Sequence, residues 1–301
     1  MQKTLISIIG STGIGKTKLA IEMAKHIGTE IISCDSRQFF KEMKIGTATP
    51  TDEELAQAKH HFIGHLSVQE YYSIGQYEED ALEKIEEIFE KNDFAVLVGG
   101  SMMYEKAVVE GLNDLPEANA ENQEKLQKIL DEEGLEKLQE ILKNLDEEYY
   151  NVVHKENPRR LLRAIDVIWQ TGRKYSEIIA EPKHKRDFKV IRIGITAPRE
   201  IMYERINLRV DKMLEKGLID EVKSLTKYQN LVPLQTVGYT EIFKYLEGTW
   251  DLDFAVEEIK KNSRRYAKRQ ETWNRKVENV TWLPYDYSEE QLHEILSKIE
   301  K

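Results

Sequence analysis

The sequence contains a single cysteine, Cys34, among its 301 residues. One cysteine excludes an internal disulfide and any zinc site built mainly from thiolates, so we interpret Cys34 as a small buried residue at a strand end. No apolar run approaches the roughly 20 residues that a membrane-spanning helix needs. The apolar stretch that follows Met1 is also too short for a secretory signal. We therefore expect a cytoplasmic protein with no membrane partner.

Beyond these absences, the most informative feature is a glycine-rich loop near the start of the chain. It matches G-x-x-x-x-G-K-[ST] and lies between an apolar, strand-like run and a segment of helical spacing. Its residues are Gly10, Ser11, Thr12, Gly13, Ile14, Gly15, Lys16 and Thr17. The backbone N–H groups of such a loop, the helix N-terminus and the lysine bind phosphate, and the Thr17 hydroxyl suits Mg²⁺. We therefore predict a site for a di- or triphosphate with Mg²⁺.

The hydrophobic pattern predicts an α/β fold. Short apolar, β-branched runs alternate with helical periods; the expected strands are Thr4–Ile9, Glu30–Cys34, Phe94–Val98, Val190–Ile195 and Val280–Leu283. Strand, loop, helix and strand in succession indicate a P-loop NTPase-like, doubly wound, mostly parallel sheet. The main expected helices outside the insertion described next are Ser73–Asn92, Glu200–Lys216, Ile219–Tyr228, Glu257–Lys276 and a tail from Glu289.

Between Leu112 and about Pro182 the strand pattern disappears, and leucines and isoleucines recur at helical spacing. Asp146 can cap one helix, and Pro158 can begin another that ends near Gly172. We therefore predict an all-helical insertion domain of residues 112–182 within an α/β core of residues 1–111 and 183–301.

Charge is distributed unevenly along a chain whose net charge is −10. Residues 110–151 contain 13 acidic and 4 basic side chains, whereas residues 155–192 contain 11 basic and 5 acidic ones. Residues 259–276 contain 8 basic side chains and 1 acidic side chain. Each basic segment alone is most simply a solvated helix face, but two of them beside a phosphate-binding loop favour a polyanionic partner.

The expected second strand is followed by Asp35, Ser36, Arg37 and Gln38. Because the carboxyl ends of parallel strands meet at one edge of the sheet, Asp35 should lie near the phosphates, although it could equally cap the next turn. The expected third strand is followed by Gly99-Gly100-Ser101, where many P-loop hydrolases have a Mg²⁺-binding aspartate. This weakens an ATPase interpretation and favours a site in which pyrophosphate is a leaving group.

Further candidate residues lie in three clusters. Arg159-Arg160-Leu161-Leu162-Arg163 would present arginines on one helix face and leucines to the core, Gln235–Tyr239 forms a loop before a helix, and Arg264–Arg275 alternates cations with aromatics. Each can be a nucleic-acid contact or an ordinary wet helix face. His60, His61 and His65 lack a cysteine or nearby carboxylate to complete a metal site.

Together these motifs resemble the tRNA dimethylallyltransferase (isopentenylpyrophosphate transferase) family, in order over nearly the whole chain. The matching segments are Gly10–Thr17, Asp35–Gln38, Ile45–Ala48, His60-His61, Gly99–Ser101, Arg159–Arg163, Met213 with Gly217-Leu218, Gln235–Tyr239, and Arg269-Gln270 with Trp273. The P-loop alone is unspecific, but the ordered set is specific.

The resemblance implies transfer of a dimethylallyl group from dimethylallyl diphosphate to N6 of adenosine 37 in tRNA, with release of pyrophosphate and formation of i6A. Asp35 would accept the N6 proton, while Thr12 and Arg209 would serve the diphosphate and the transfer step. We expect a monomer that binds the anticodon stem-loop. The residues expected at the tRNA are Asp35, Ser36, Arg37, Gln38, Ser101, Arg159, Arg160, Leu161, Leu162, Arg163, Gln235, Tyr239 and Arg269.

One segment departs from the family pattern: Gly-Gly-Ser-Met-Met-Tyr stands where Gly-Gly-Thr-Gly-Leu-Tyr is usual, so Met102 and Met103 change the residues after Ser101. Three other functions stay open at this point. They are an adenylate isopentenyltransferase acting on free AMP, ADP or ATP, a P-loop small-molecule kinase, and an RNA-binding protein whose P-loop is only structural.

Overall fold

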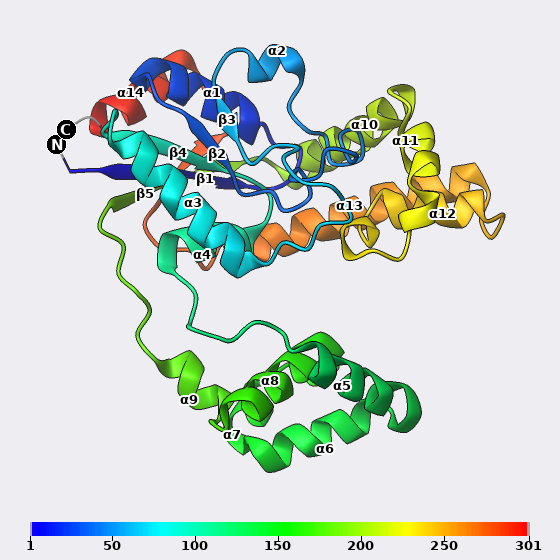
Figure 1. The fold of residues 1–301 in the computed structure, drawn as a ribbon. Helices are drawn as coiled ribbons and strands as arrows, with labels where there is room; N and C mark the ends of the chain where they lie inside the picture. The colour runs from blue at the N-terminus through cyan, green and yellow to red at the C-terminus, as the bar shows by residue number, and fades with distance from the viewer. Residues whose placement is uncertain (1, 300–301) are drawn as a thin grey trace. The chain divides into compact units, whose positions relative to one another are not determined.

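The computed structural model describes residues 2–299, which form two compact units. The first unit comprises the chain up to Val109 and from Arg186 onwards, and the second is Glu110–Lys185. From the sequence we expected the helical insertion at residues 112–182. Figure 1 shows the sheet and its helices in the first unit and helices alone in the second.

The strands of residues 2–299 form one six-stranded sheet of order β3-β2-β4-β1-β5-β6. Every pairing in it is parallel. The strands are β1 Thr4–Gly10, β2 Ile31–Ser33, β3 His60–His61, β4 Phe94–Val98, β5 Lys189–Thr196 and β6 Val280–Pro284. The predicted α/β class and parallel sheet are confirmed, and only the two-residue edge strand β3 was missed.

Alternating side chains bury both faces of this sheet, as expected for parallel strands covered by helices. Leu5 and Leu97 belong to one apolar cluster, which includes residues of α3, α11, α12 and α13. Ile6 and Val96 belong to the other, with α1 and α14. The helices of this unit are α1 Lys16–Ile27, α2 Asp52–Leu55, α3 Ile74–Phe89, α4 Met102–Glu110, α10 Arg199–Glu215, α11 Leu218–Ser224, α12 Tyr239–Leu246, α13 Leu252–Asn274 and α14 Glu289–Ile299. Two 3₁₀ turns, η1 Thr226–Tyr228 and η2 Val232–Leu234, follow α11.

Two expected helices have different limits in the structure. The predicted Ile219–Tyr228 helix ends as α11 at Ser224, and η1 continues the chain. The predicted Glu257–Lys276 helix begins earlier, at Leu252, because the Asp251 side chain accepts a hydrogen bond from Phe254 N and caps it.

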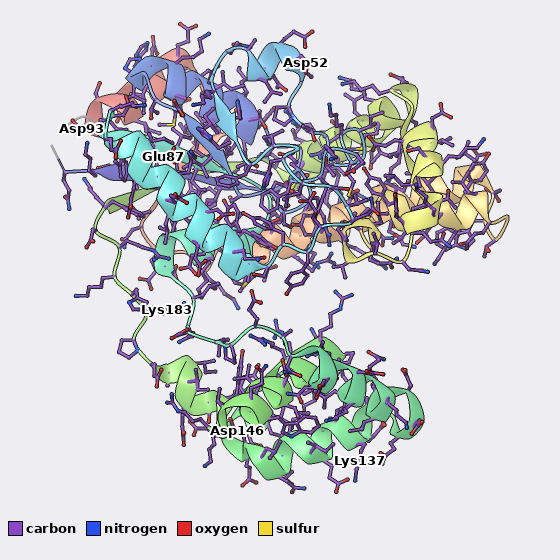
Figure 2. The ribbon with its side chains drawn as sticks, viewed as in Figure 1. Asp52, Glu87, Asp93, Lys137, Asp146 and Lys183 are labelled. Atoms are coloured by element: carbon purple, nitrogen blue, oxygen red, sulfur yellow. The ribbon has the colours of Figure 1, made fainter. Side chains whose placement is uncertain are left out.

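The second unit is helical throughout, with α5 Ala120–Glu133, α6 Leu135–Leu145, α7 Glu147–Val152, α8 Pro158–Thr171 and α9 Tyr175–Ala180. Its own core contains Leu126, Leu142 and Ile165. As predicted, α8 begins at Pro158 and ends before Gly172, and Asp146 caps α7 by accepting from Tyr149 N. Asp146, labelled in Figure 2, is buried and also accepts from Ser176 N and Oγ at 2.7 and 2.9 Å.

Among residues 2–299 no helix combines the length and the apolar character that crossing a membrane requires. Met102 and Met103 begin α4, so the departure from the family pattern is compatible with a regular helix start. The Met103 side chain is 48% exposed.

Candidate active site

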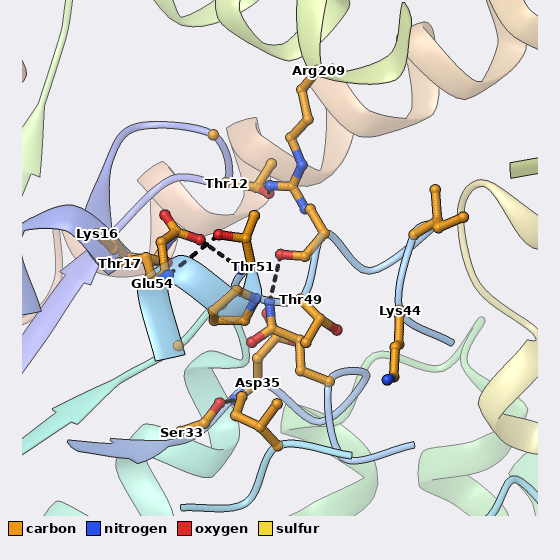
Figure 3. Close-up of a pocket in the computed structure, with 18 of the residues that line it drawn as sticks. Thr12, Lys16, Thr17, Ser33, Asp35, Lys44, Thr49, Thr51, Glu54 and Arg209 are labelled. Atoms are coloured by element: carbon orange, nitrogen blue, oxygen red, sulfur yellow. Dashed lines mark hydrogen bonds between the residues drawn. The ribbon is translucent and has the colours of Figure 1, made fainter. Parts of the chain in front are cut away.

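A cavity of about 1000 Å³ lies at the carboxyl end of the sheet in the first unit. Its walls come from the P-loop, the residues after β2 and β4, helices α10 and α13, and the segment between β2 and β3. The β1–loop–α1 unit, the end of β2 and the end of β4 therefore meet there, as the topology of parallel sheets predicts. Figure 3 shows Thr12, Lys16, Asp35 and Arg209 around this cavity.

The P-loop folds around its own lysine. Lys16 Nζ donates to the carbonyl oxygens of Gly10 and Ser11 at 3.0 and 2.8 Å. Burial lowers the pKa of Lys16 to about 8, although Asp35 opposes this effect, and nearby Arg209 lowers the pKa further. An anion in the loop would replace these carbonyl contacts and restore the charge of the lysine.

Arg209 of α10 completes the phosphate side of the cavity. Its guanidinium donates to Thr12 Oγ1 at 2.7 Å and to the carbonyl of Thr47 at 3.1 Å. Burial lowers the pKa of Arg209, and Asp35 partly offsets that effect. The neighbouring Arg205 donates to Gly13 O at 3.0 Å. Thr12 and Arg209, both predicted catalytic residues, are thus in direct contact.

Asp35 follows β2 and lines the same cavity. Its Oδ1 accepts a 3.1 Å hydrogen bond from Arg37 N, so it also caps its turn, the alternative role expected from sequence. Gly100 lies against it, because a Cβ at Gly100 would be 2.8 Å from Asp35 Oδ2. At Gly99 a Cβ would be 2.4 Å from the backbone of Cys34. The two glycines therefore let the end of β4 approach the end of β2.

Ser36, Gln38 and Ser101, which were expected at the tRNA, follow the ends of β2 and β4. Ser101 Oγ accepts from Ser36 N at 3.0 Å and lies 2.9 Å from Ser36 Oγ, which joins the two strand ends. Gln38 Nε2 donates to Thr47 O and Ala48 O at 3.3 and 3.2 Å.

Arg37 is directed elsewhere, since it donates to the carbonyl oxygens of Val232 and Pro233 at 3.1 Å. This contact ties the residues after β2 to η2.

Glu221 of α11 fixes the turn that supports both Arg209 and Gln38. Its carboxylate accepts from Ile45 N at 2.7 Å, Gly46 N at 2.9 Å and Tyr239 Oη at 2.6 Å. Gly46 must be glycine, because its Cβ would lie 2.5 Å from the Tyr239 ring. The same turn presents Thr47 O, which accepts from Arg209.

Three residues expected at the tRNA have buried side chains. Tyr239 is fully buried, and burial together with Glu221 raises the pKa of its hydroxyl. Leu161 and Leu162 belong to the core of the helical unit. In this structure the three side chains pack in the hydrophobic cores, and their role at the tRNA stays a prediction.

Some of the predicted basic residues are exposed, whereas Arg163 is held by partners within the helical unit. Arg159 and Arg160 are exposed on α8, whereas Arg163 pairs with buried Asp166 at 3.2 Å and also donates to Pro116 O. Arg269 is exposed on α13 above the Tyr266 ring, and Gln235 is exposed and donates to Gln229 O.

Gln270 was matched to the family pattern but was not predicted as a site residue. It is 1% exposed on α13, and its Oε1 accepts from Thr12 N at 2.7 Å while its Nε2 donates to Gly100 O at 2.8 Å. The one feature of the sequence that could have pointed to Gln270 is that it is an uncharged amide within the basic segment 259–276.

Within residues 2–299 no group of three or more histidine, cysteine, aspartate or glutamate side chains is arranged to hold a metal ion. His61 Nε2 contacts Glu30 Oε2 at 2.5 Å, and His60 Nδ1 contacts Ala58 O at 2.8 Å. Thr17 lines the cavity beside Lys16, where a hydroxyl can join diphosphate oxygens around Mg²⁺.

The chain is similar to a described protein family and to several of its members. The family model described as IPP transferase matches residues 38–277. The tRNA dimethylallyltransferase of Christiangramia forsetii is 49% identical over 300 residues, covering 99% of both chains. That of Flavobacterium psychrophilum is 46% identical, covering 97% of both chains.

Two solved structures are also similar. The full-length tRNA isopentenylpyrophosphate transferase of Bacillus halodurans is 36% identical with a TM-score of 0.73, and the match covers 99% of this chain and 96% of that one. A eukaryotic dimethylallyltransferase acting on tRNA is 25% identical with a TM-score of 0.83, and the match covers 99% of this chain and 77% of that one. These matches extend over the phosphate-binding core and the helical unit alike, and the chain belongs to the IPP transferase family of tRNA dimethylallyltransferases.

Proposed function

We propose that the protein transfers the dimethylallyl group of dimethylallyl diphosphate to N6 of adenosine 37 in tRNA. The observation that supports this proposal is that the Thr12–Arg209 pair and Asp35 line one cavity at the carboxyl end of the sheet. A diphosphate site and a carboxylate that can accept a proton are the two parts that such an alkyl transfer needs.

In the proposed reaction N6 attacks C1 of the dimethylallyl group, a C–N bond forms, and the C1–O bond breaks. The electron pair of that bond leaves with pyrophosphate, and the N6 proton passes to Asp35. An exocyclic adenine amine is a weak nucleophile, so a carboxylate that takes its proton assists the attack. The products are i6A and pyrophosphate.

The residues around the P-loop would stabilise the charge that develops on the leaving group. Lys16 Nζ can exchange its contacts with Gly10 O and Ser11 O for phosphate oxygens. Arg209 supplies a second cation, which its contact with Thr12 holds near the loop. Because Lys16 and Arg209 are both half-buried, their attraction for an anion is stronger than at the surface.

Mg²⁺ is the proposed cofactor, with Thr17 as its protein ligand. Thr17 fits this role because it lines the cavity next to Lys16, and Mg²⁺ commonly takes one or two protein groups together with substrate phosphate oxygens and waters. When bound, the ion would neutralise part of the diphosphate charge.

Recognition of the adenine would depend on Gln38, Ser36 and Ser101 around Asp35. A base in a stacked anticodon loop must be extruded before N6 can reach a cavity, and an amide can then read its edge. The exposed Arg159 and Arg160 on α8 would contact phosphates of the anticodon stem-loop. We propose that the protein acts as a monomer. We propose the cytoplasm as its location.

The test is to incubate the protein with dimethylallyl diphosphate, Mg²⁺ and unmodified tRNA bearing adenosine 37, then to search the digested nucleosides for i6A by mass spectrometry. A tRNA with guanosine at position 37 is the matched control and should remain unmodified. Efficient prenylation of AMP without modification of tRNA would instead establish an adenylate isopentenyltransferase. ADP formation from ATP that depends on a metabolite would establish a kinase.

A further inference from the structure

Gln270 connects the two chemical halves of the cavity. Its Oε1 accepts from Thr12 N at 2.7 Å on the phosphate side, and its Nε2 donates to Gly100 O at 2.8 Å on the side of Asp35. Both hydrogen bonds are buried or partly buried, and the side chain is 1% exposed. The residue is 258 positions from Thr12 in sequence, so helix α13 brings it there.

Thr12 is held from two directions as a result. Gln270 of α13 binds its backbone N–H, while Arg209 of α10 binds its hydroxyl at 2.7 Å. The two helices pack on each other through Met202 and Ile206 of α10 and Ala267 of α13. The threonine beside the leaving group therefore has a fixed backbone and a fixed side chain.

Gly100 is held in the same way. Its carbonyl accepts from Gln270 Nε2 and from Tyr266 Oη, both at 2.8 Å. Because Gly100 lies against the carboxylate of Asp35, a shift of the Gly100 backbone would move the carboxylate that is proposed to accept the N6 proton. A displacement of about 1 Å can cost about 10²-fold in rate.

An uncharged amide satisfies both partners at position 270, which a carboxylate cannot do. Thr12 N–H needs an acceptor and Gly100 C=O needs a donor, and glutamine presents one of each. A glutamate would keep the acceptor but turn a second carboxylate oxygen toward Gly100 O and Asp35. A leucine would remove the acceptor of Thr12 N–H and leave Tyr266 Oη as the remaining side-chain donor to Gly100 O.

We propose that Gln270 is a positioning residue that sets the P-loop and Asp35 in register for transfer, an inference that rests on the proposed function. Gln270 lines the cavity, but both polar atoms of its side chain are engaged by Thr12 N and Gly100 O. It acts through Thr12 on the diphosphate and through Gly100 on the carboxylate of Asp35.

The experiment measures two quantities for Gln270→Leu and Gln270→Glu in the full chain: the Kd for inorganic pyrophosphate by calorimetry, and the single-turnover rate of i6A formation on tRNA. For Gln270→Leu we expect pyrophosphate to bind about 10-fold more weakly and the rate to fall about 10- to 100-fold. The Kd for tRNA should stay within about 2-fold of the wild-type value. The proposed phosphate contacts, Arg159 and Arg160 of α8, take no part in the hydrogen bonds around Gln270.

Asn262→Leu is the matched control. Asn262 is also a side-chain amide on α13, and its Nδ2 donates to Glu241 at 2.8 Å, with no bond to the P-loop. It should lower the melting temperature like Gln270→Leu but leave the pyrophosphate Kd unchanged. If both variants lose pyrophosphate affinity equally, or if Gln270→Leu keeps the wild-type Kd and rate, the positioning role is wrong.

Gln270→Glu provides a second readout if the leucine variant does not fold. Burial raises the pKa of a carboxyl group, so this glutamate should regain a proton, and with it the donor to Gly100, as the pH falls from about 8.5 to 6. Its rate relative to wild type should rise over that range, and a flat ratio would overturn the proposal. Absence of i6A with the wild-type protein would refute the proposed function, whereas the pyrophosphate Kd values would still test Gln270.

Discussion

The guanidinium of Arg209 donates a 2.7 Å hydrogen bond to the hydroxyl of Thr12, which joins helix α10 to the phosphate-binding loop. The same guanidinium reaches the carbonyl of Thr47, in the turn held by Glu221. One side chain therefore links the loop for the leaving group to the turn that binds Gln38.

Arg209→Lys should keep the positive charge but lose this forked geometry. We expect the single-turnover rate of transfer to fall about 10²-fold, with little change in the Kd for tRNA. The control is Arg205→Lys, since Arg205 is exposed and its hydrogen bond to the loop goes to the Gly13 carbonyl rather than to Thr12. A wild-type rate in Arg209→Lys would show that charge alone is sufficient.

Asp35→Asn should remove the proton acceptor while keeping an oxygen for Arg37 N. We expect transfer to fall by about 10²-fold or more, measured as i6A per enzyme, with tRNA affinity largely kept. Asp93→Asn is a suitable control, because Asp93 directly precedes β4 (Figure 2). It therefore lies at the amino end of that strand, whereas the cavity lies at the carboxyl end. Unchanged turnover in Asp35→Asn would remove this carboxylate from the mechanism.

The charge of Lys16 should make pyrophosphate binding dependent on pH. Burial lowers its pKa from 10.5 to about 8, so in the free protein the lysine is charged below that pH and becomes neutral above it. The affinity for pyrophosphate should therefore weaken as the pH rises through about 8, a change that calorimetry at a series of pH values would detect.

Lys16→Arg is the control for this titration. Arginine stays charged over the whole range, so any change left in that variant reports the protonation of pyrophosphate itself. Identical pH profiles for wild type and Lys16→Arg would contradict a titrating lysine.

The two arginines of α8 should respond differently to alanine substitution. Arg160→Ala should reduce the slope of log Kd against log salt for tRNA by about one, without a change in melting temperature. Arg163→Ala should destabilise the helical unit, because it leaves buried Asp166 without its charged partner. Salt titrations and thermal unfolding would separate the effects, and an unaltered slope in Arg160→Ala would assign that residue to a solvated face.

Much of the fold could be predicted because its signals are local. The P-loop, the N-cap Asp146 of α7, the first residue Pro158 of α8, and the apolar strands each depend on a few neighbouring residues. Strand β3 could not be predicted in this way, because two histidines have no strand-like pattern and pair only where β2 offers its edge.

The candidate site was only partly predictable, because its contacts join distant parts of the chain. Nothing near position 270 indicates that Thr12 N is its partner, and an amide among arginines is typical of a wet helix face. The reverse applies to Tyr239: an aromatic residue in a loop before a helix was expected at the tRNA, whereas Glu221 and Gly46 enclose it in the core.

The position of the helical insertion also determines the order in which the core can assemble during synthesis. Strand β1 pairs with β4 on one side and β5 on the other, and the whole Glu110–Lys185 unit lies between those two strands in sequence. While the ribosome makes that unit, β1 has only one neighbour and an open edge, which is prone to wrong pairing. The helical unit has its own core and local contacts, so it can fold during this interval. Closure of the central sheet must wait for β5.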